Sequence, residues 1–454
     1  MNDYKSSHHL NNLKQLQTLF SHFPSSLTKG FSKAISPRRC CAIALTLTAT
    51  ACQANSDTSA NTADSLKLGS LLPITGDLAQ YGGPMQDAAS LLADTVNACG
   101  GVFGQPVELI SEDNQTEPSA GASAMTKLAE VDQVAGVVGA AASSVSSASV
   151  DIAVRNKVVQ ISPASTSPVF TDRAKAGDFE GFWFRTAPPD TFQGGALAQL
   201  AQNRGYEEVS VLAINNDYGN GLVESFSTAY GALGGTVSNG DNPTLYAPDA
   251  TTFDSEVAEA FSSDPDAVMV VAYPETGSLI LKSAFEQGLL DDDTQLILTD
   301  GMKDDSVADL VGKTADGAYI VSGVIGTAPS AGGPALAEFT TLYKEKFDGR
   351  DPGVFDPNTW DAAAVLVLAA EAAQSSDGEA IKASVTNVAN APGTEVTDVC
   401  KGLEMVREGQ DINYQGASGT IEFDAQGDVV GRYDIWTITD EGALDVIETV
   451  DVGG

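Results

Sequence analysis

The chain has 454 residues, and its 61 Asp and Glu against 24 Lys and Arg give a formal net charge of −37. This acidic surplus argues against nucleic acid as a partner, because phosphate binding requires surface patches of Lys and Arg. The three histidines, His8, His9 and His22, all precede an apolar segment that ends at Ala51.

Residues 1–51 have the features of a removed secretory signal. Arg38 and Arg39 precede a twelve-residue apolar stretch, which is too short to cross a bilayer as a helix. Small residues then lead to Cys52, so we expect a lipoprotein-type signal and a periplasmic protein anchored through lipid on Cys52. Cleavage without lipidation and a start codon further along the chain are the alternatives. Residues 52–65 are small and polar and are predicted to form a flexible tether.

Removal of this leader leaves a mature chain without histidine. That excludes Ser-His-Asp triads, Cys-His dyads and zinc sites that use histidine. An enzyme would then need an unusual Ser-Lys or carboxylate mechanism. We therefore expect a protein that is not an enzyme and that has no cofactor and no metal site.

Two cysteines remain in the mature chain besides Cys52, namely Cys99 and Cys400. In an oxidising compartment, two such cysteines suggest one disulfide. Two unrelated buried thiols are the alternative.

From residue 66 onward, short β-branched runs alternate with amphipathic helical patterns. The first helical pattern runs from Met85 to Val96 and has Pro84 at its predicted first helical position. Two more helical patterns include Ala122 and Phe192. Strands that alternate with helices of this length predict parallel sheets covered on both faces. The predicted strands span residues 66–72, 107–111, 135–139, 158–162, 209–214, 267–273 and 295–298.

This pattern occurs in two blocks that meet at residues 183–189, where a predicted strand runs into a Pro-Pro break. After residue 329 we expect three helical stretches, and then a glycine-rich turn at 416–419 that leads to short strands ending at Val452. The prediction is an α/β protein of two lobes. One lobe comprises residues 66–186 plus 329–415, and the other comprises 187–328 plus 416–454. Several crossings between the lobes would form a hinge.

Polar residues follow the predicted strands at their carboxyl ends, where open parallel sheets bind ligands. Ser143 and Ser144 stand at one helix start, and Ser165 and Thr166 open the next segment in the same way. Hydroxyls and free backbone N–H groups at such positions can hold a carboxylate. Asp300 is an acceptor suited to an ammonium group.

Tyr81, Tyr218 and Tyr273 offer aromatic faces and hydroxyls to the rest of a ligand. Each of these residues also has a simpler interpretation. Serine at a helix start is commonly an N-cap, aspartate before glycine is commonly a turn residue, and tyrosine at a strand end is commonly packing. Their coincidence at strand ends favours a site for an amino acid zwitterion.

Three other motifs point to no chemistry. The glycine-rich segment 100–104 follows a helix and precedes a strand, the wrong order for a dinucleotide site, so we expect a turn. Segment 414–419 lacks the spacing of a nucleophile elbow. The aspartate runs at 291–293 and 304–305 do not have EF-hand spacing and are predicted to be solvated loops.

Six segments in order resemble the type I periplasmic binding proteins of branched-chain amino acid ABC transporters, typified by the leucine/isoleucine/valine-binding protein. The resemblance extends from about residue 66 to the C-terminus. It implies a clamp of two doubly wound, Rossmann-like lobes, joined by a hinge of three crossovers and closing like a Venus flytrap. The segments are GSLLPITGDLAQYG, NACGGVFGQPVEL, VVGAAASS, ISPASTSP, NDYGNG and INYQGASGTIEFDAQGD.

The resemblance also implies roles for single residues. Ser143 and Thr166 match the carboxylate binders of the family, and the backbone at Ala164 and Ser165 takes part. Asp300 matches the acidic residue that receives the α-amino group, although a typical member has glutamate there.

In the same comparison, Tyr218 and Tyr273 match aromatic residues of the second lobe, and Tyr81 matches one that lines the side-chain pocket. The short first-lobe disulfide of the family is absent. The pair Cys99 and Cys400 would have to take its place.

The function implied is that of a monomeric periplasmic receptor. It would bind a small amino acid, most simply a branched-chain or aliphatic one, and deliver it to an ABC transporter permease, with contact to the membrane through its lipid anchor alone. The alternatives are a clamp for urea, short amides or another small organic solute, and a ligand sensor for a signalling partner.

Overall fold

A computed structural model describes residues 65–290 and 294–452. The predicted leader, Cys52, the tether up to residue 64 and the aspartate run at 291–293 lie outside the described residues.

The first sheet has five parallel strands in the order β2-β1-β3-β4-β5. β3 and β4 are buried along their whole length, because helices cover both faces of the sheet. The edge strand β2 carries polar side chains at Glu108, Glu112 and Asp113. The five strands are β1 (Lys67–Leu72), β2 (Glu108–Asp113), β3 (Gly136–Gly139), β4 (Val159–Ser162) and β5 (Trp183–Arg185).

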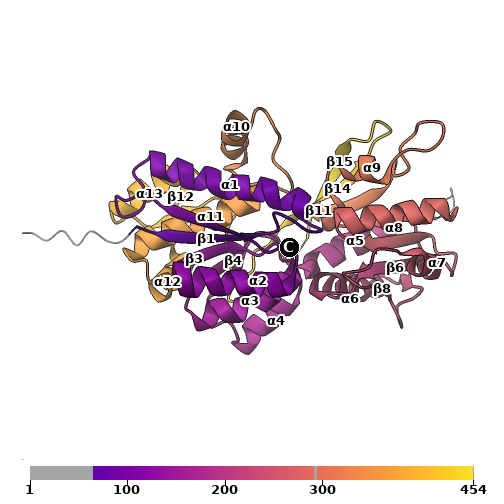
Figure 1. The fold of residues 1–454 in the computed structure, drawn as a ribbon, viewed down its shortest axis with the longest axis horizontal. Helices are drawn as coiled ribbons and strands as arrows, with labels where there is room; N and C mark the ends of the chain where they lie inside the picture. Colours follow the sequence, from indigo (N-terminus) through magenta and orange to yellow (C-terminus); the bar gives the residue numbers. More distant parts are fainter. Residues whose placement is uncertain (1–64, 291–293, 453–454) are drawn as a thin grey trace, which may run out of the picture. The chain divides into compact units, whose positions relative to one another are not determined.

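Helices from both ends of the chain cover this sheet. α1 packs against α11 on one face, and α2 packs against α3 on the other (Figure 1). The helices are α1 (Ala79–Ala98), α2 (Pro118–Thr126), η1 (Lys127–Asp132), α3 (Ser143–Arg155), α4 (Val169–Ala176), α10 (Leu336–Lys346), α11 (Asp356–Ala373), α12 (Gly378–Ala389) and α13 (Val399–Arg407). A short parallel pair, β12 (Thr394–Val396) and β13 (Ile412–Tyr414), joins the same lobe.

The second sheet has the order β15-β14-β11-β10-β9-β6-β7, and β8 also pairs with β6. It is parallel except for β14 and β15, which pair antiparallel at one edge. The strands are β6 (Glu208–Ile214), β7 (Thr236–Val237), β8 (Thr244–Tyr246), β9 (Ala267–Val271), β10 (Gln295–Leu298), β11 (Ile325–Pro329), β14 (Arg432–Ile438) and β15 (Leu444–Asp451). The helices are α5 (Asp190–Arg204), α6 (Asp217–Ala232), α7 (Asp254–Ala260), α8 (Pro274–Glu286), η2 (Asp300–Met302) and α9 (Val307–Val311).

The chain crosses between the two sheets three times. It does so between β5 and α5, between β11 and α10, and between β13 and β14. The predicted α/β fold of two doubly wound lobes joined by three crossovers is therefore confirmed, and all seven predicted strands are present within one or two residues of their expected ends.

The last crossover lies later in the chain than predicted. Ile421, Phe423 and Val429 pack in the core of the first lobe, and the ring of Phe423 lies 5.0 Å from that of Phe184. The expected transfer to the second lobe at residue 416 is therefore wrong. The apolar side chains after the glycine-rich turn keep the chain on the first lobe until β14 begins at Arg432.

Two predictions about helices are also wrong. Four helices, α10 to α13, follow residue 329 instead of three. Pro84 lies inside α1, which begins five residues earlier at Ala79. A turn before the helix already gives its first N–H groups partners, because Ala79 donates to the carbonyl of Gly76 and Leu78 donates to the Thr116 hydroxyl.

A disulfide joins Cys99, directly after α1, to Cys400 in α13, with Cα atoms 5.9 Å apart. The two residues are 301 positions apart in sequence, so the bond connects the beginning and the end of the first lobe. Of the two alternatives left by the cysteine count, the structure contains the disulfide.

Within residues 65–290 and 294–452, no helix combines the length and the apolar character needed to cross a bilayer. The most apolar helix, α11, is instead buried on nearly all sides in the core of the first lobe.

Candidate ligand-binding site

A pocket lies at the carboxyl ends of strands from both sheets. Its first-lobe residues follow β1 and β3 or precede α4 or α11, and its second-lobe residues follow β6, β9 and β10. The lining residues are Leu78, Tyr81, Met85, Ala141, Ala142, Ser143, Ala164, Tyr218, Tyr273, Asp300, Gly301 and Phe355. Six of the eight ligand-binding residues expected from the sequence are in this set. Ser165 and Thr166 are not.

The first-lobe end of the pocket contains the start of α3. Ser143 is its first residue, is 2% exposed, and accepts a hydrogen bond of 3.3 Å from the N–H of Ser167. No side chain of the described residues caps the first turn of α3, which leaves N–H groups there for a ligand. Since a helix N-terminus carries a partial positive charge, this end of the pocket suits a carboxylate.

Ser165 and Thr166 lie just behind this end of the pocket. The Ser165 hydroxyl is 3.0 Å from the Ala141 carbonyl and 2.8 Å from the hydroxyl of Ser146, and its N–H donates to Ser162. These contacts turn Ser165 into the loop and away from the pocket. Thr166 is also buried, and its hydroxyl has no hydrogen-bond partner among the described residues.

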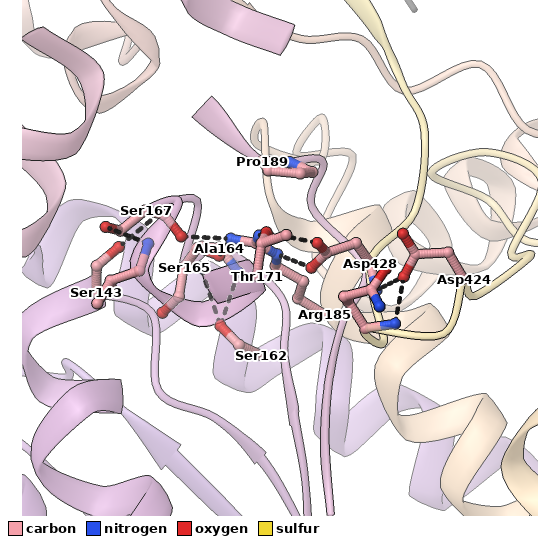
Figure 2. Close-up of polar contacts among 12 residues, drawn as sticks. Ser143, Ser162, Ala164, Ser165, Ser167, Thr171, Arg185, Pro189, Asp424 and Asp428 are labelled. Atoms are coloured by element: carbon pink, nitrogen blue, oxygen red, sulfur yellow. Dashed lines mark hydrogen bonds and ion pairs between the residues drawn. The ribbon is translucent and has the colours of Figure 1, made fainter. Parts of the chain in front are cut away.

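A buried ion pair holds this loop in place. Figure 2 shows Arg185, at the end of β5, beside Asp428, and the distance between Arg185 Nε and Asp428 Oδ1 is 2.6 Å. The same guanidinium donates to the carbonyls of Ser165 and Ser167 and to the hydroxyl of Thr171. Arg185 is fully buried. It therefore fixes the loop that carries Ala164 and Thr166.

The second-lobe end of the pocket is acidic. Asp300 follows β10, is 3% exposed, and accepts a hydrogen bond of 2.7 Å from the Tyr218 hydroxyl. Burial raises the pKa of Asp300, and the hydrogen bond from Tyr218 opposes that rise. The lysine nearest in sequence, Lys303, pairs with Asp434 at 2.9 Å. Asp300 is therefore free to receive a positively charged ligand group.

Three tyrosines surround this carboxylate. The rings of Tyr218 and Tyr273 stack with centroids 5.7 Å apart, and the Tyr81 hydroxyl donates to the main-chain carbonyl of Asp300 at 3.1 Å. Burial raises the pKa of all three hydroxyls well above the ordinary value for tyrosine. They therefore stay neutral. The hydroxyls of Tyr81 and Tyr218 donate to Asp300, and that of Tyr273 accepts from the Asn216 side-chain amide at 3.3 Å.

The remaining wall of the pocket is apolar. It is formed by Leu78, Met85 and Phe355 together with the ring of Tyr81, which contacts Phe355 edge to face at 5.9 Å. Leu78 and Phe355 were not predicted from the sequence, and Met85 was assigned to a helical core face. Phe355 precedes α11, far along the chain from the other pocket segments, so no local pattern marked it.

Sequence reasoning also missed Asp190 and Gln193 in the first turn of α5. Both are fully buried, and burial raises the pKa of Asp190 well above its ordinary range, with Asp300 adding to the rise. The Pro-Pro break before Asp190 was recognised as a crossover. Nothing in that segment indicated that the carboxyl group would be buried.

The glycine-rich segment has the role expected of it. The segment at 100–104 is a tight turn, in which Gly100, Gly101 and Gly104 have positive φ angles. The described part of the chain has no cluster of three or more His, Cys, Asp or Glu side chains arranged to hold a metal.

Comparison with known proteins agrees with this geometry. Residues 84–441 match the family described as the receptor family ligand binding region. A substrate-binding protein of a chemotactic signal transduction system, BasB of Halobacterium salinarum, is 25% identical over 395 residues, which cover 83% of this chain and 87% of that protein.

Two further relatives carry names that refer to amino acids. The Leu/Ile/Val-binding protein homolog 1 of Brucella abortus is 27% identical over 318 residues, covering 68% of this chain and 79% of the relative. The crystal structure of a leucine-binding protein, LivK of Thermotoga maritima, superposes with a TM-score of 0.70 and 26% identity, covering 85% of this chain and 99% of that one.

Proposed function

This chain belongs to the family of receptor ligand-binding regions, and on that basis we propose that it is an extracytoplasmic solute receptor for a small amino acid. The amino acid is bound between the two lobes and is passed unchanged to an ABC transporter permease. The relatives support this proposal, since they are named as binding proteins.

The observation that carries the proposal is the placement of opposite charge preferences at the two ends of one pocket. The start of α3 at Ser143 suits a carboxylate, and the buried Asp300 suits an ammonium group. A zwitterion satisfies both ends at once. A ligand with only one of these groups would leave the other end without a partner, which is costly in a buried site.

The apolar wall of Leu78, Met85 and Phe355 favours an aliphatic side chain on that amino acid. Such a wall offers no charged partner to a basic or acidic side chain. The names of the Brucella and Thermotoga relatives support the same ligand class, branched-chain amino acids.

Ligand binding would favour closure of the clamp, because the two lobes contribute opposite ends of the pocket. A ligand shifts a conformational equilibrium only as far as it binds one state more tightly than the other. An amino acid held by both Ser143 and Asp300 binds the closed state more tightly than the open one. In the open state it can contact only one lobe at a time.

The proposal places the receptor in the periplasm as a monomer, with residues 1–51 removed and Cys52 lipidated. The lipid would hold the receptor beside the permease. Support for this part comes from the sequence of the leader alone.

A thermal-shift screen tests the function. The protein is first unfolded and refolded to remove bound ligand, and is then screened against amino acids, urea, short amides and aromatic acids. A ligand present at a thousandfold above its Kd should stabilise the folded state by about 4 kcal/mol. We expect leucine, isoleucine or valine to raise the melting temperature, and 4-methylpentanoate, which lacks the amine of leucine, to have no effect. A shift with amine-free solutes alone would contradict the amino acid assignment.

A second candidate function is that of a ligand sensor that reports to a signalling partner. The observation that favours it is the similarity to the substrate-binding protein of a chemotactic system. Copurification from the native membrane separates the two functions. A permease retained with the ligand-loaded protein supports transport, whereas a chemotaxis transducer retained in its place supports sensing.

A further inference from the structure

A second buried acid, Asp190, lies within the electrostatic influence of the ligand-binding Asp300, whose charge raises the pKa of Asp190. Asp190 is the first residue of α5 and is 0% exposed. Its N–H donates to the Thr166 carbonyl at 2.7 Å, which fixes the helix start beside the loop that lines the pocket. Neither carboxyl oxygen of Asp190 has a hydrogen-bond partner among the described residues. A buried carboxylate without partners is strongly disfavoured, and such a group normally takes up a proton.

Arg185 does not neutralise Asp190. Its positive charge lowers the pKa of Asp190, but its guanidinium makes its hydrogen bonds to Asp428, Thr171 and two backbone carbonyls. Asp300 adds a second negative charge. Two buried carboxylates that repel one another cannot both stay ionised without a counter-charge.

Hydrogen bonding decides which acid keeps the proton. Asp300 accepts a bond from the Tyr218 hydroxyl at 2.7 Å, and Gln193 also lowers its pKa. For Asp190 the rise in pKa is opposed by the nearby Thr166 hydroxyl, which makes no hydrogen bond of normal geometry, and by the charge of Arg185, which gives it no hydrogen bond. Hydrogen bonds to a carboxylate favour its ionised form, so the charge belongs on Asp300.

The other groups that face Asp190 do not titrate near neutral pH. They are Tyr218 of α6, Tyr273 before α8 and Tyr433 of β14, and burial raises the pKa of each hydroxyl. Arg185 of β5 is paired with Asp428. The pair of Asp190 and Asp300 is therefore the titrating unit beneath the ammonium end of the pocket.

We propose that Asp190 is the proton-holding partner of Asp300, carrying a proton while the pocket is empty and releasing it to solvent when an ammonium ligand binds at Asp300. This inference rests on the proposed function, because the positive charge of the ligand is what replaces the proton. In this proposal Asp190 does not contact the ligand. It is a positioning residue, which influences binding only through the charge of Asp300.

The proposal predicts the direction in which ligand affinity changes with pH. Proton release on binding means that affinity rises with pH wherever the empty pocket is protonated at Asp190. The slope is at most about tenfold per pH unit for one released proton. At pH values where Asp190 is already ionised in the empty protein, affinity becomes independent of pH.

Calorimetric titration of the wild-type protein with L-leucine, in buffers of different ionisation enthalpy near neutral pH, counts the protons released. We expect net release of up to about one proton per leucine bound. The Asp190→Asn variant should bind leucine without release and without the pH dependence. Asp217→Asn removes a half-buried carboxylate next to Tyr218 and should keep the release of the wild type.

The outcomes separate this inference from the proposed function. Leucine binding without proton release in the wild type overturns the inference alone, and it needs no variant that folds. Proton release that persists in Asp190→Asn overturns it as well. If only amine-free solutes bind, the proposed function fails and this inference fails with it.

A measurement on the empty protein gives independent evidence. The infrared band of a protonated carboxyl group should be present in the ligand-free wild type near neutral pH and reduced in Asp190→Asn. Identical bands in the two proteins would contradict a proton on Asp190.

Discussion

The hydroxyl of Tyr81, in the first turn of α1, donates a hydrogen bond of 3.1 Å to the main-chain carbonyl of Asp300, 219 residues further along the chain. This bond joins the first lobe to the second at the ligand pocket itself, and it is buried. Asp300 therefore has two roles. Its backbone connects the lobes, and its side chain is available to the ligand.

Removal of that hydroxyl should weaken ligand binding. Tyr81→Phe keeps the ring that packs on Phe355 and removes only the bond between lobes, which is worth about 0.5–1.5 kcal/mol. We expect a three- to tenfold higher Kd for the bound amino acid by calorimetry, about the equivalent of that energy. Tyr246→Phe is the matched control, because its buried hydroxyl contacts Thr276 within the second lobe. An equal loss of affinity in both variants would refute a specific role for the Tyr81 bond.

Replacement of the acid that faces the ligand should have a larger effect. Asp300→Ala should raise the Kd for leucine by about thirtyfold or more, because loss of one partner of a buried charge pair costs about 2–5 kcal/mol. The circular dichroism spectrum should stay that of the wild type. Asp305→Ala is the control, since Asp305 is exposed and does not line the pocket. Unchanged affinity in Asp300→Ala would rule out the zwitterion site.

The buried ion pair of Arg185 and Asp428, behind the first-lobe end of the pocket, should stabilise the folded protein. Arg185→Met leaves Asp428 buried with a charge and no guanidinium, which is expected to cost about 3–5 kcal/mol in the free energy of unfolding. Arg432→Met removes a guanidinium that pairs with Asp451 on the surface and should cost at most about 1 kcal/mol. Urea denaturation measures both values. Similar values for the two variants would show that burial of the first pair has no energetic consequence.

The disulfide should stabilise the first lobe without contributing to ligand binding. Its bond closes a loop of about three hundred residues, and a native disulfide contributes typically about 2–4 kcal/mol. The double variant with Cys99→Ser and Cys400→Ser should therefore melt at a lower temperature and still bind leucine. Mass spectrometry of the unreduced mature protein should find the two cysteine peptides joined. Two free thiols in that experiment would contradict the assignment.

The pH dependence of stability should contain a contribution from Asp361. Burial raises the pKa of Asp361 to about 6, although Tyr414, Ala417 and Ser418 donate hydrogen bonds to it. Because the folded-state pKa is raised, the stabilising contribution is present below the unfolded pKa of about 4 and is lost as pH rises through about 6.

The wild type should accordingly lose up to about 3 kcal/mol relative to Asp361→Asn between those pH values. Asn at this position forfeits hydrogen bonds at every pH, so the pH-dependent part of the difference is the relevant quantity. Urea denaturation at several pH values measures it. A difference that does not vary with pH would mean that Asp361 titrates as it does in the unfolded chain.

The sequence by itself determined the strands, the alternation with helices and the two-lobed α/β fold. Period and residue type are local properties, so the runs at 66–72 and 209–214 could be recognised without knowledge of their neighbours. The rule that ligands bind at the carboxyl ends of parallel strands then placed Ser143, Tyr218 and Asp300 at one site, and all three line the same pocket.

The tertiary structure decided which side chains turn toward the pocket and which are buried behind it. Ser165 has the same local signature as Ser143, but its hydroxyl contacts Ser146 and the Ala141 carbonyl. Phe355 reaches the pocket and Asp190 is fully buried only because segments far apart in sequence pack together. Burial and charge environment depend on such distant neighbours. No periodicity or spacing within one segment encodes them.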